Sequence, residues 1–262
     1  MPLQRFVDRD GVVRSALHIT LNEAASAGIE EVCLVVHPGD SDAYAEVATG
    51  ADVKLTFVTQ PSPRGYADAV LCAREFVGDD SFLHLVGDHL WVAAGEESCA
   101  KQLVEIAEAE AAAVSAVQAT RENNLPLYGA VGGRRVAQRR DLYEADRVVE
   151  KPTPTQAEQE LVVPGLRAGH YLCLFGMHVL PPSIMEFIAS ADGEDASLSS
   201  ALSALSARER LLAHESAGRR YNLGVKYGHL HAQLALAISG SERETVLSQL
   251  VELLALRDSD RE

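Results

Sequence analysis

Strand-like and helix-like segments alternate from residue 12 to residue 120, and this alternation constrains the fold more than any other feature of the sequence. The strand-like runs are short and rich in β-branched residues, and apolar residues at helical spacing follow each of them. Crossover helices join successive parallel strands, so the pattern predicts an α/β protein with a doubly wound, mostly parallel sheet. The expected strands are 32–36, 53–60, 82–86 and 114–120, and the expected helices are 12–27, 43–47, 66–77 and 97–113.

The rhythm changes in the second half of the chain. Residues 127–175 contain short strands broken by a glycine pair, a basic run and a proline-rich stretch, with no long helical pattern. This composition predicts an antiparallel region that forms the second wall of a crevice at the end of the sheet. Helices are expected again at 182–189, 197–208, 227–239 and 242–256.

Composition excludes several classes of protein. A formal net charge of −15 repels a phosphate backbone, so we expect no binding to nucleic acid. The sequence has no run of about 18 apolar residues and no signal-peptide core, so we expect a cytoplasmic protein without a membrane partner. Its four cysteines lack the spacing of a zinc site or a disulfide scaffold and are expected to be reduced thiols.

The stretch FLHLVGDHLW, residues 82–91, is the first candidate for chemistry. It is a core strand that ends on glycine and Asp88, at the edge where open α/β sheets place their ligands. A carboxylate there can hold a divalent cation through a hard oxygen. The alternative is an aspartate that caps or turns the chain.

A second candidate lies in TQPSPRGYADAV, residues 59–70. Gln60 ends a strand, and Arg64 and Gly65 stand just ahead of a helix. An amide side chain, a guanidinium and the backbone amides at a helix start can converge on a base or a phosphate. An ordinary connection between strand and helix is the alternative.

Two further candidates lie in the second half of the chain. Gly129 follows a tyrosine, and Glu150 and Lys151 end a strand at a proline, where a lysine can neutralise a sugar phosphate and a glutamate can accept hydrogen bonds from hydroxyls. Asn222 and Lys226 flank a glycine before a helix and suit phosphate or sugar oxygens. The alternatives are a solvated ion pair and simple helix capping.

Taken in order, the motifs RGYADAVL, GD, YG, EKP, GHY and YNLGVKYG resemble the sugar-1-phosphate nucleotidyltransferases, and most of all the bacterial UTP–glucose-1-phosphate uridylyltransferases. The similarity covers nearly the whole chain. It implies a Rossmann-like sheet with a smaller antiparallel sugar-side region, in one domain over residues 1–262. Within it, 1–125 is the nucleotide-side half, 126–225 the sugar-side half and 226–262 the C-terminal helices. The reaction implied joins UTP and a sugar 1-phosphate into a nucleotide sugar and pyrophosphate, with Mg²⁺ as cofactor, and the resemblance allows a homo-oligomer.

The resemblance also assigns roles residue by residue. Asp88 matches a metal-binding aspartate, and Lys151 and Lys226 match lysines that contact phosphate, so these three are the catalytic candidates. The nucleotide-binding candidates are Gln60, Arg64 and Gly65, the sugar-binding candidates are Gly129 and Glu150, and the metal candidates are Asp88 and Asn222.

Two departures from the family pattern bear on activity. Family members begin with a strand and a G-x-G-T-R loop that cradles the triphosphate, and the given sequence opens where that loop would end. The missing strand would be central, so its neighbours are expected to expose unpaired ladder groups. Asn222 also stands where the family has a second metal-binding aspartate. Three readings stay open: a translation start further upstream, a remodelled enzyme, or an inactive relative that binds a nucleotide sugar or a partner subunit in a regulatory role.

Overall fold

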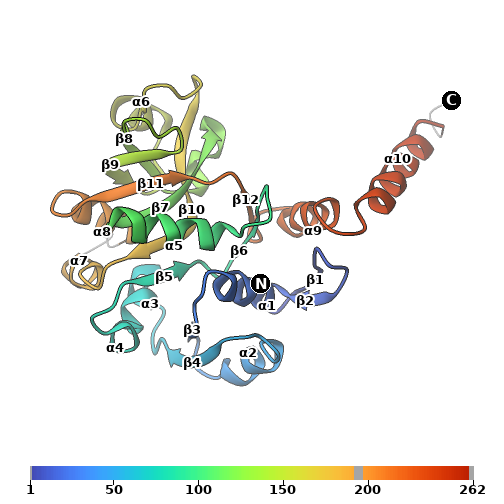
Figure 1. Ribbon diagram of the computed structural model, residues 1–262, viewed down its shortest axis with the longest axis horizontal. Helices are drawn as coiled ribbons and strands as arrows, with labels where there is room; N and C mark the ends of the chain where they lie inside the picture. Colours follow the sequence, from blue (N-terminus) through green and yellow to red (C-terminus); the bar gives the residue numbers. More distant parts are fainter. Residues whose placement is uncertain (1, 192–196, 260–262) are drawn as a thin grey trace.

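The amino-terminal segment begins with a small hairpin. The computed structural model describes residues 2–191 and 197–259, and in it β1 (Arg5–Val7) pairs antiparallel with β2 (Val13–Ser15) (Figure 1). Helix α1 (Ala16–Ser26) follows at once, and the side chain of its N-cap residue Ser15 accepts a hydrogen bond from the His18 amide. The helix expected from residue 12 therefore starts later, because its first residues belong to the hairpin.

Strands and helices then alternate as the sequence predicts. The elements of the first half are β3 (Glu31–Val36), α2 (Ser41–Val47), β4 (Lys54–Thr59), α3 (Tyr66–Cys72), α4 (Arg74–Val77), β5 (Phe82–Leu85), β6 (His89–Val92), α5 (Cys99–Glu110) and β7 (Ala113–Arg121). Those of the second half are η1 (Glu122–Leu127), β8 (Ala130–Arg135), β9 (Leu142–Val149), α6 (Pro154–Glu160), β10 (His170–Leu180), α7 (Ile184–Ser190), α8 (Leu198–Ser206), β11 (Leu211–Glu215), β12 (Arg219–Asn222), α9 (Gly228–Ile238) and α10 (Arg243–Ser259).

A six-stranded sheet in the order β5-β10-β7-β11-β9-β8 forms the centre of the molecule. Its strands are mixed in direction: β7 and β11 are parallel, whereas β10 runs antiparallel to both β5 and β7. The expected parallel pairing is found there and between β3 and β4. The long strand β10 is the main difference, because it comes from the second half of the chain and inserts between two strands of the first.

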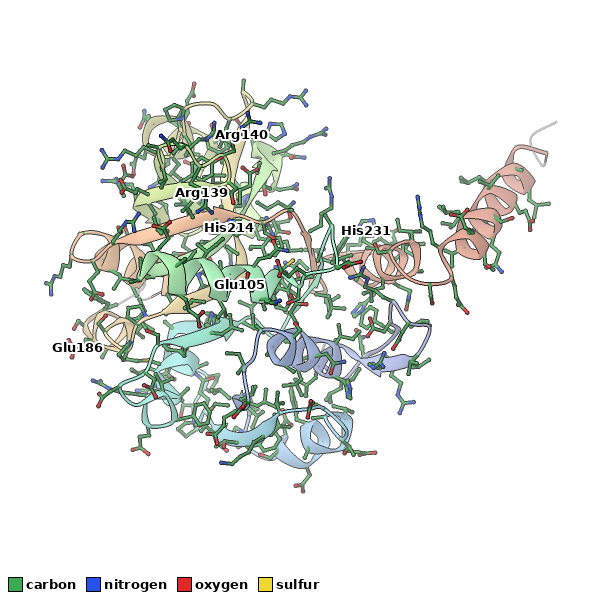
Figure 2. The ribbon with its side chains drawn as sticks, viewed as in Figure 1. Glu105, Arg139, Arg140, Glu186, His214 and His231 are labelled. Atoms are coloured by element: carbon green, nitrogen blue, oxygen red, sulfur yellow. The ribbon has the colours of Figure 1, made fainter. Side chains whose placement is uncertain are left out.

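Helices cover both faces of this sheet, which confirms the α/β class. Successive residues of β7 point to opposite faces, and Val114 packs with Leu103 of α5, whereas Val117 belongs to the core that contains Ile184 of α7 and Leu202 of α8. All five of these side chains are fully buried. Charged side chains stay outside: Figure 2 labels Glu105 on α5, Arg140 in the β8–β9 turn and Glu186 on α7, all exposed.

Three two-stranded sheets stand beside the central one, and two of them matter for the site. β3 pairs only with β4, and β6 pairs antiparallel with β12 among the residues described. As expected from the sequence, β3 and β5 each have one edge without a partner strand within residues 2–191 and 197–259. At the other end of the chain, α10 extends away from the body of the molecule (Figure 1). No helix in the described part of the chain is long and apolar enough to cross a membrane.

Candidate functional site

The β6–β12 ribbon brings together Asp88 and Asn222, which are far apart in the sequence. Asn222 is paired with His89, the first residue of β6, and the Leu223 amide donates a hydrogen bond of 2.8 Å to the Asp88 carbonyl. Strand β6 was not expected, because the sequence predicts a strand over 82–86 and none in the short apolar run after Asp88. This ribbon places both metal candidates at the same end of two paired strands.

The Asp88 carboxylate is held by its neighbour but stays accessible. Its Oδ1 lies 2.6 Å from Nδ1 of His89, and its side chain is 45% exposed. Burial raises the pKa of the Asp88 carboxyl, but the hydrogen bond and charge of His89, together with the charge of Lys151, outweigh burial and hold that pKa below its usual value. Asp88 is therefore a carboxylate near neutral pH, with one oxygen oriented by His89 and the other available to a ligand.

The EKP segment lies close to this carboxylate. The Lys151 amide donates a 3.2 Å hydrogen bond to the Tyr128 carbonyl, and the Lys151 ammonium lies 3.8 Å from Oε1 of Glu150. The backbone of Lys151 has a φ of 43°, a left-handed conformation that is uncommon for residues other than glycine. The Lys151 side chain is 59% exposed, so its ammonium can reach a ligand placed beside Asp88.

Glu150 and Gly129 are held by a helix of the second half. The hydroxyl of Ser199, in the first turn of α8, donates a 2.6 Å hydrogen bond to Oε2 of Glu150. A Cβ atom at Gly129 would lie 2.6 Å from that hydroxyl oxygen and 2.8 Å from Cδ1 of Leu174, too close for any side chain. Gly129 thus has a packing reason to be glycine, and it leaves room for the bond that orients the Glu150 carboxylate.

Gln60 is oriented by the start of α3. Its Nε2 donates to the Gly65 carbonyl at 3.1 Å and to Oδ2 of Asp68 at 2.7 Å, and the Arg64 guanidinium lies 3.0 Å from Oδ1 of the same carboxylate. Gly65 has a φ of 105°, which favours glycine at this helix start. Because the amide N–H groups of Gln60 are engaged, the group it can offer to a ligand is its carbonyl oxygen.

Tyr66 connects the loop that holds Gln60 to the strand that leads to Asp88. Its hydroxyl lies 2.8 Å from Nε2 of His84 in β5. Burial raises the pKa of Tyr66, and the negative charge of Asp88 raises it further. The Gly65–Tyr66 corner and Asp88 therefore lie within electrostatic reach of each other.

Lys226 is exposed and contacts its neighbour Tyr227. It lies in the turn between Asn222 and α9, and its ammonium is 5.1 Å from the ring of its neighbour Tyr227. Oδ1 of Asn222 accepts a 2.7 Å hydrogen bond from the Gly224 amide in the same turn. Among the residues described, no ion pair joins Lys226 to a carboxylate of the site. The structure thus sets Asn222 beside Asp88 on the β6–β12 ribbon, with the charge of Lys151 acting on Asp88, and places Lys226 in the exposed turn after Asn222.

Arg220 is the main residue that the sequence analysis missed. It is 7% exposed, and its guanidinium carbon lies 3.7 Å from the centre of the Tyr128 ring. Its Nη2 donates to the Thr120 hydroxyl at 3.1 Å. The signal was present, since Arg220 stands two residues before Asn222 and Tyr128 just before Gly129, but sequence spacing alone does not show that the two motifs touch.

The sequence model of the nucleotidyl transferase family matches residues 11–219. The chain belongs to this family. It is 26% identical to the UTP–glucose-1-phosphate uridylyltransferase of Streptococcus pneumoniae serotype 4, over 92% of this chain and 86% of that protein. It is 28% identical to UTP–glucose-1-phosphate uridylyltransferase 2 of Streptococcus pyogenes serotype M3, over 87% of this chain and 81% of that protein.

Solved structures share the fold of this nucleotidyl transferase family chain. The UDP-glucose pyrophosphorylase from Acinetobacter baumannii superposes with a TM-score of 0.77 at 24% identity, over 97% of this chain and 91% of the other. A UDP-glucose pyrophosphorylase solved with UDP-glucose superposes with a TM-score of 0.74 at 19% identity, over 89% of each chain. These likenesses establish the nucleotide-sugar transferase fold.

The site of this nucleotidyl transferase family chain suits a divalent metal that substrate helps to hold. Within the described residues, no three His, Cys, Asp or Glu side chains gather into a metal cluster. Asp88 and Asn222 would instead offer one charged and one neutral oxygen at the same end of the β6–β12 ribbon. Magnesium commonly takes one or two carboxylates and completes its shell with water and substrate phosphates, so this donor set fits it.

Proposed function

We propose that the protein is a nucleotidyltransferase that makes a nucleotide sugar of the UDP-glucose type, and pyrophosphate, from UTP and a sugar 1-phosphate. The observation that carries the proposal is that Tyr128 contacts both the Asp88 and the Lys151 segments. Its ring meets the ring of His89, which holds Asp88, edge-on at 6.2 Å, and its carbonyl accepts the Lys151 amide. The names of the streptococcal relatives favour UTP and glucose 1-phosphate as substrates.

The proposed reaction needs charge stabilisation more than acid–base chemistry. An oxygen of the sugar phosphate attacks the α-phosphorus of UTP, the new P–O bond forms, and the bond to the β-phosphate oxygen breaks to release pyrophosphate. Lys151 lies where it can neutralise phosphate oxygens, and this stabilises the charge of the transition state. Mg²⁺ held by Asp88 and Asn222 would supply Lewis-acid neutralisation of the phosphates.

Different side chains would recognise the base of UTP and the sugar of the sugar 1-phosphate. The carbonyl oxygen of Gln60 can accept a hydrogen bond from the imide N–H of uracil, while Asp68 and the Gly65 carbonyl fix the amide in that orientation. On the other side, Glu150 can accept hydrogen bonds from sugar hydroxyls, and Ser199 keeps its carboxylate in place. Thymine offers the same imide N–H, so Gln60 alone does not select uracil.

The test is release of pyrophosphate by the purified chain, with and without an upstream extension, in the presence of UTP, glucose 1-phosphate and Mg²⁺. The proposal expects release that requires all three components and stops when EDTA removes the metal. Release that continues without the sugar phosphate indicates hydrolysis of UTP and contradicts the proposal, as does no release from either form.

An inactive relative that binds a nucleotide sugar is the second candidate, and three features of the turn after β12 favour it. Asn222 is neutral, its Oδ1 already accepts the Gly224 amide, and Lys226 turns toward Tyr227. Calorimetry with UDP-glucose separates the two candidates. Binding that persists while no pyrophosphate is released supports the inactive relative, and turnover excludes it.

A further inference from the structure

The amide of Gln60 is held in one orientation by two acceptors. Its Nε2 atom donates to the Gly65 carbonyl at 3.1 Å and to Oδ2 of Asp68 at 2.7 Å. A carbonyl and a carboxylate accept hydrogen bonds and donate none, so the nitrogen end of the amide must face them. The reverse orientation would set the Gln60 oxygen against two other oxygens, with no hydrogen bond between them. The two acceptors therefore fix which end of the amide a ligand meets.

Asp68 is itself held in place. It stands in the first turn of α3, its side chain is 16% exposed, and its Oδ1 lies 3.0 Å from the Arg64 guanidinium. Each carboxylate oxygen thus has its own donor, Arg64 for Oδ1 and Gln60 for Oδ2. The backbone of Gln60 is fixed as well, since its amide donates a 2.9 Å hydrogen bond to the carbonyl of Val36 at the end of β3. Arg64 therefore supports Gln60 through Asp68.

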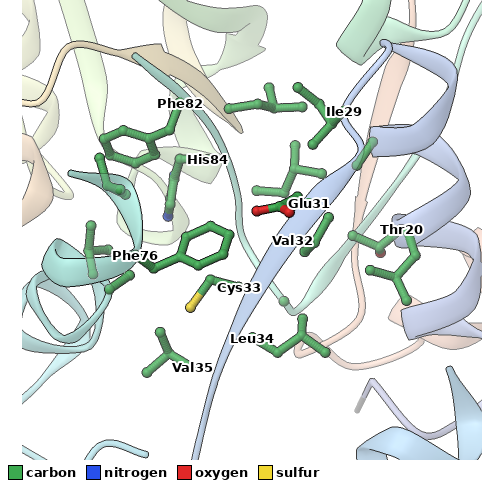
Figure 3. Close-up of a pocket in the computed structure, with 18 of the residues that line it drawn as sticks. Thr20, Ile29, Glu31, Val32, Cys33, Leu34, Val35, Phe76, Phe82 and His84 are labelled. Atoms are coloured by element: carbon green, nitrogen blue, oxygen red, sulfur yellow. The ribbon is translucent and has the colours of Figure 1, made fainter. Parts of the chain in front are cut away.

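The oxygen of the Gln60 amide is the end left for a ligand. Among the described residues no donor bonds to Oε1 of Gln60, and this atom is not one of the buried polar atoms left without a partner, so it is open to solvent. A separate cavity of about 530 Å³ lies between β3 and β5, and most of the side chains that line it are apolar (Figure 3). Tyr66 lines that cavity, whereas Gln60, Arg64 and Asp68 do not. The Gln60 oxygen is thus offered outside the cavity, just after β4.

A fixed acceptor distinguishes bases by the group that they present to it. Uracil and thymine carry a hydrogen on the ring nitrogen N3, which can donate to the Gln60 oxygen. The same ring nitrogen of cytosine carries a lone pair and no hydrogen, so it would face the Gln60 oxygen without a bond. An amide that is free to rotate would turn its N–H toward cytosine and would accept both bases. Selectivity therefore comes from the groups that stop Gln60 from rotating.

We propose that Asp68 is a specificity-determining residue of the base site. By holding the Gln60 nitrogen inward, it makes the site an acceptor, which selects a uridine or thymidine nucleotide over a cytidine nucleotide. Asp68 acts through Gln60 and is a positioning residue. The inference rests on the proposed function, in which Gln60 meets the base.

The test compares UDP-glucose with CDP-glucose, which differ only in the base. Their dissociation constants are measured by calorimetry with Mg²⁺ present, for the parent and for three variants. Asp68→Leu removes the acceptor at similar size, whereas Asp68→Asn keeps an oxygen that can accept from Gln60. Asp42→Leu, at an exposed aspartate in the first turn of the equally short helix α2, is the matched control.

The parent should prefer UDP-glucose over CDP-glucose by about 100-fold or more, because cytosine leaves the Gln60 oxygen without a donor. Asp68→Leu should reduce this preference by about tenfold, since one of the two groups that orient the amide is lost. Asp68→Asn and Asp42→Leu should keep it within about threefold. A preference that is unchanged in Asp68→Leu, or that falls equally in Asp68→Asn, overturns the proposal. A parent that binds neither ligand, or both alike, also overturns it.

A second pair of variants decides the question if leucine at position 68 disturbs folding. Gln60→Glu keeps an outward oxygen but sets its second oxygen against Gly65 and Asp68, so the affinity for UDP-glucose should fall about tenfold or more. Adding Asp68→Asn supplies an amide that can donate to the new carboxylate, so part of the affinity should return. A purely structural role of Asp68 gives no recovery, and losses that simply add overturn the proposal.

Ligand binding is measured without turnover, so this result and the pyrophosphate assay are read separately. A preference for UDP-glucose without pyrophosphate release contradicts nucleotidyl transfer and supports the role of Asp68. Pyrophosphate release from UTP and CTP alike contradicts the role of Asp68 and supports nucleotidyl transfer.

Discussion

The guanidinium carbon of Arg220 lies 3.7 Å from the centre of the Tyr128 ring, and this stacked pair connects two motifs of the site. Arg220 belongs to β12, which ends at Asn222, and Tyr128 precedes Gly129 and accepts the Lys151 amide. The Tyr128 ring also meets the ring of His89 edge-on at 6.2 Å, and His89 holds Asp88. One buried cation thus connects the candidate metal ligands to the candidate sugar-side residues.

Replacing Arg220 should therefore loosen the whole site. We expect Arg220→Met to lower the free energy of unfolding by about 2 kcal/mol, because it removes a desolvated cation–π contact and the bond to Thr120. Arg220→Lys should recover part of the loss, since an ammonium keeps the charge but cannot stack flat on the ring. Urea unfolding measures both, with the exposed neighbour Arg219→Met as control. Equal losses at positions 219 and 220 would contradict a specific role for the pair.

Asp88 should be needed for turnover and not for folding. Its side chain is 45% exposed, so Asp88→Asn should leave the unfolding midpoint nearly unchanged. The substitution removes the charged oxygen ligand, and we expect kcat to fall by about 100-fold or more. Asp79→Asn, at an exposed position before β5, is the matched control. Activity of Asp88→Asn within a few-fold of the parent would remove Asp88 from the metal site.

The close packing of Gly129 against Ser199 and Leu174 should make a larger side chain at position 129 destabilising. Gly129→Ala should destabilise the protein by about 1–3 kcal/mol, because its Cβ would overlap the Ser199 hydroxyl and the Leu174 side chain. Adding Ser199→Ala removes one of the two clashing atoms and should restore part of the stability, which a double-mutant cycle measures as coupling. Gly95→Ala has open space around its Cβ and should be nearly neutral. Additive losses in the cycle would show that the two residues do not press on each other.

Local patterns in the sequence predict the elements well and their assembly less well. The alternation of the first half gives β3, β4, β5 and β7 nearly residue for residue, because each strand is bounded by a turn signal. It cannot give β10, whose partners β5 and β7 are set by long-range contacts between the two halves of the chain. It also does not give β6, because this strand has only four residues and its partner β12 lies far along the chain.

The candidate site shows the same division. Asp88 and Lys151 were singled out by their position at a strand end, and Asn222 by the glycine and helix that follow it. The β6–β12 ribbon sets Asn222 beside Asp88, and the charge of Lys151 acts on Asp88. The orientation of side chains could not be read in this way. Lys226 faces Tyr227, and the Gln60 amide donates to Asp68. These orientations depend on ring contacts and hydrogen bonds that only the folded backbone defines.

Asn222→Asp tests whether the amide limits the metal site. A second carboxylate beside Asp88 would strengthen a hard-cation site, so we expect the Mg²⁺ concentration for half-maximal pyrophosphate release to fall about tenfold. An aspartate can still accept the Gly224 amide, so the turn should be preserved. Titration of Mg²⁺ against activity measures the effect, and Asp88→Asn in the same background should abolish it. An unchanged magnesium dependence would place residue 222 away from the metal.

The buried histidines of the sheet predict a loss of stability in mild acid. Burial lowers the pKa of His84 to about 4 from its ordinary value of 6.5, and burial together with the charge of His84 holds the pKa of His178 well below its ordinary value. Between these two pH values the unfolded chain binds protons that the folded chain does not, so the free energy of unfolding falls as the pH drops through this window. Each histidine contributes up to about 1.4 kcal/mol per pH unit.

Urea unfolding between the ordinary and the lowered pKa of His84 should therefore show this slope. His84→Gln should reduce it by removing one of the buried histidines whose pKa burial lowers, which also include His178 and His214. His37 is exposed beyond the end of β3, so His37→Gln is the matched control and should keep the parent slope. The same slope in the parent and in His84→Gln would mean that His84 is protonated equally in the folded and unfolded chains.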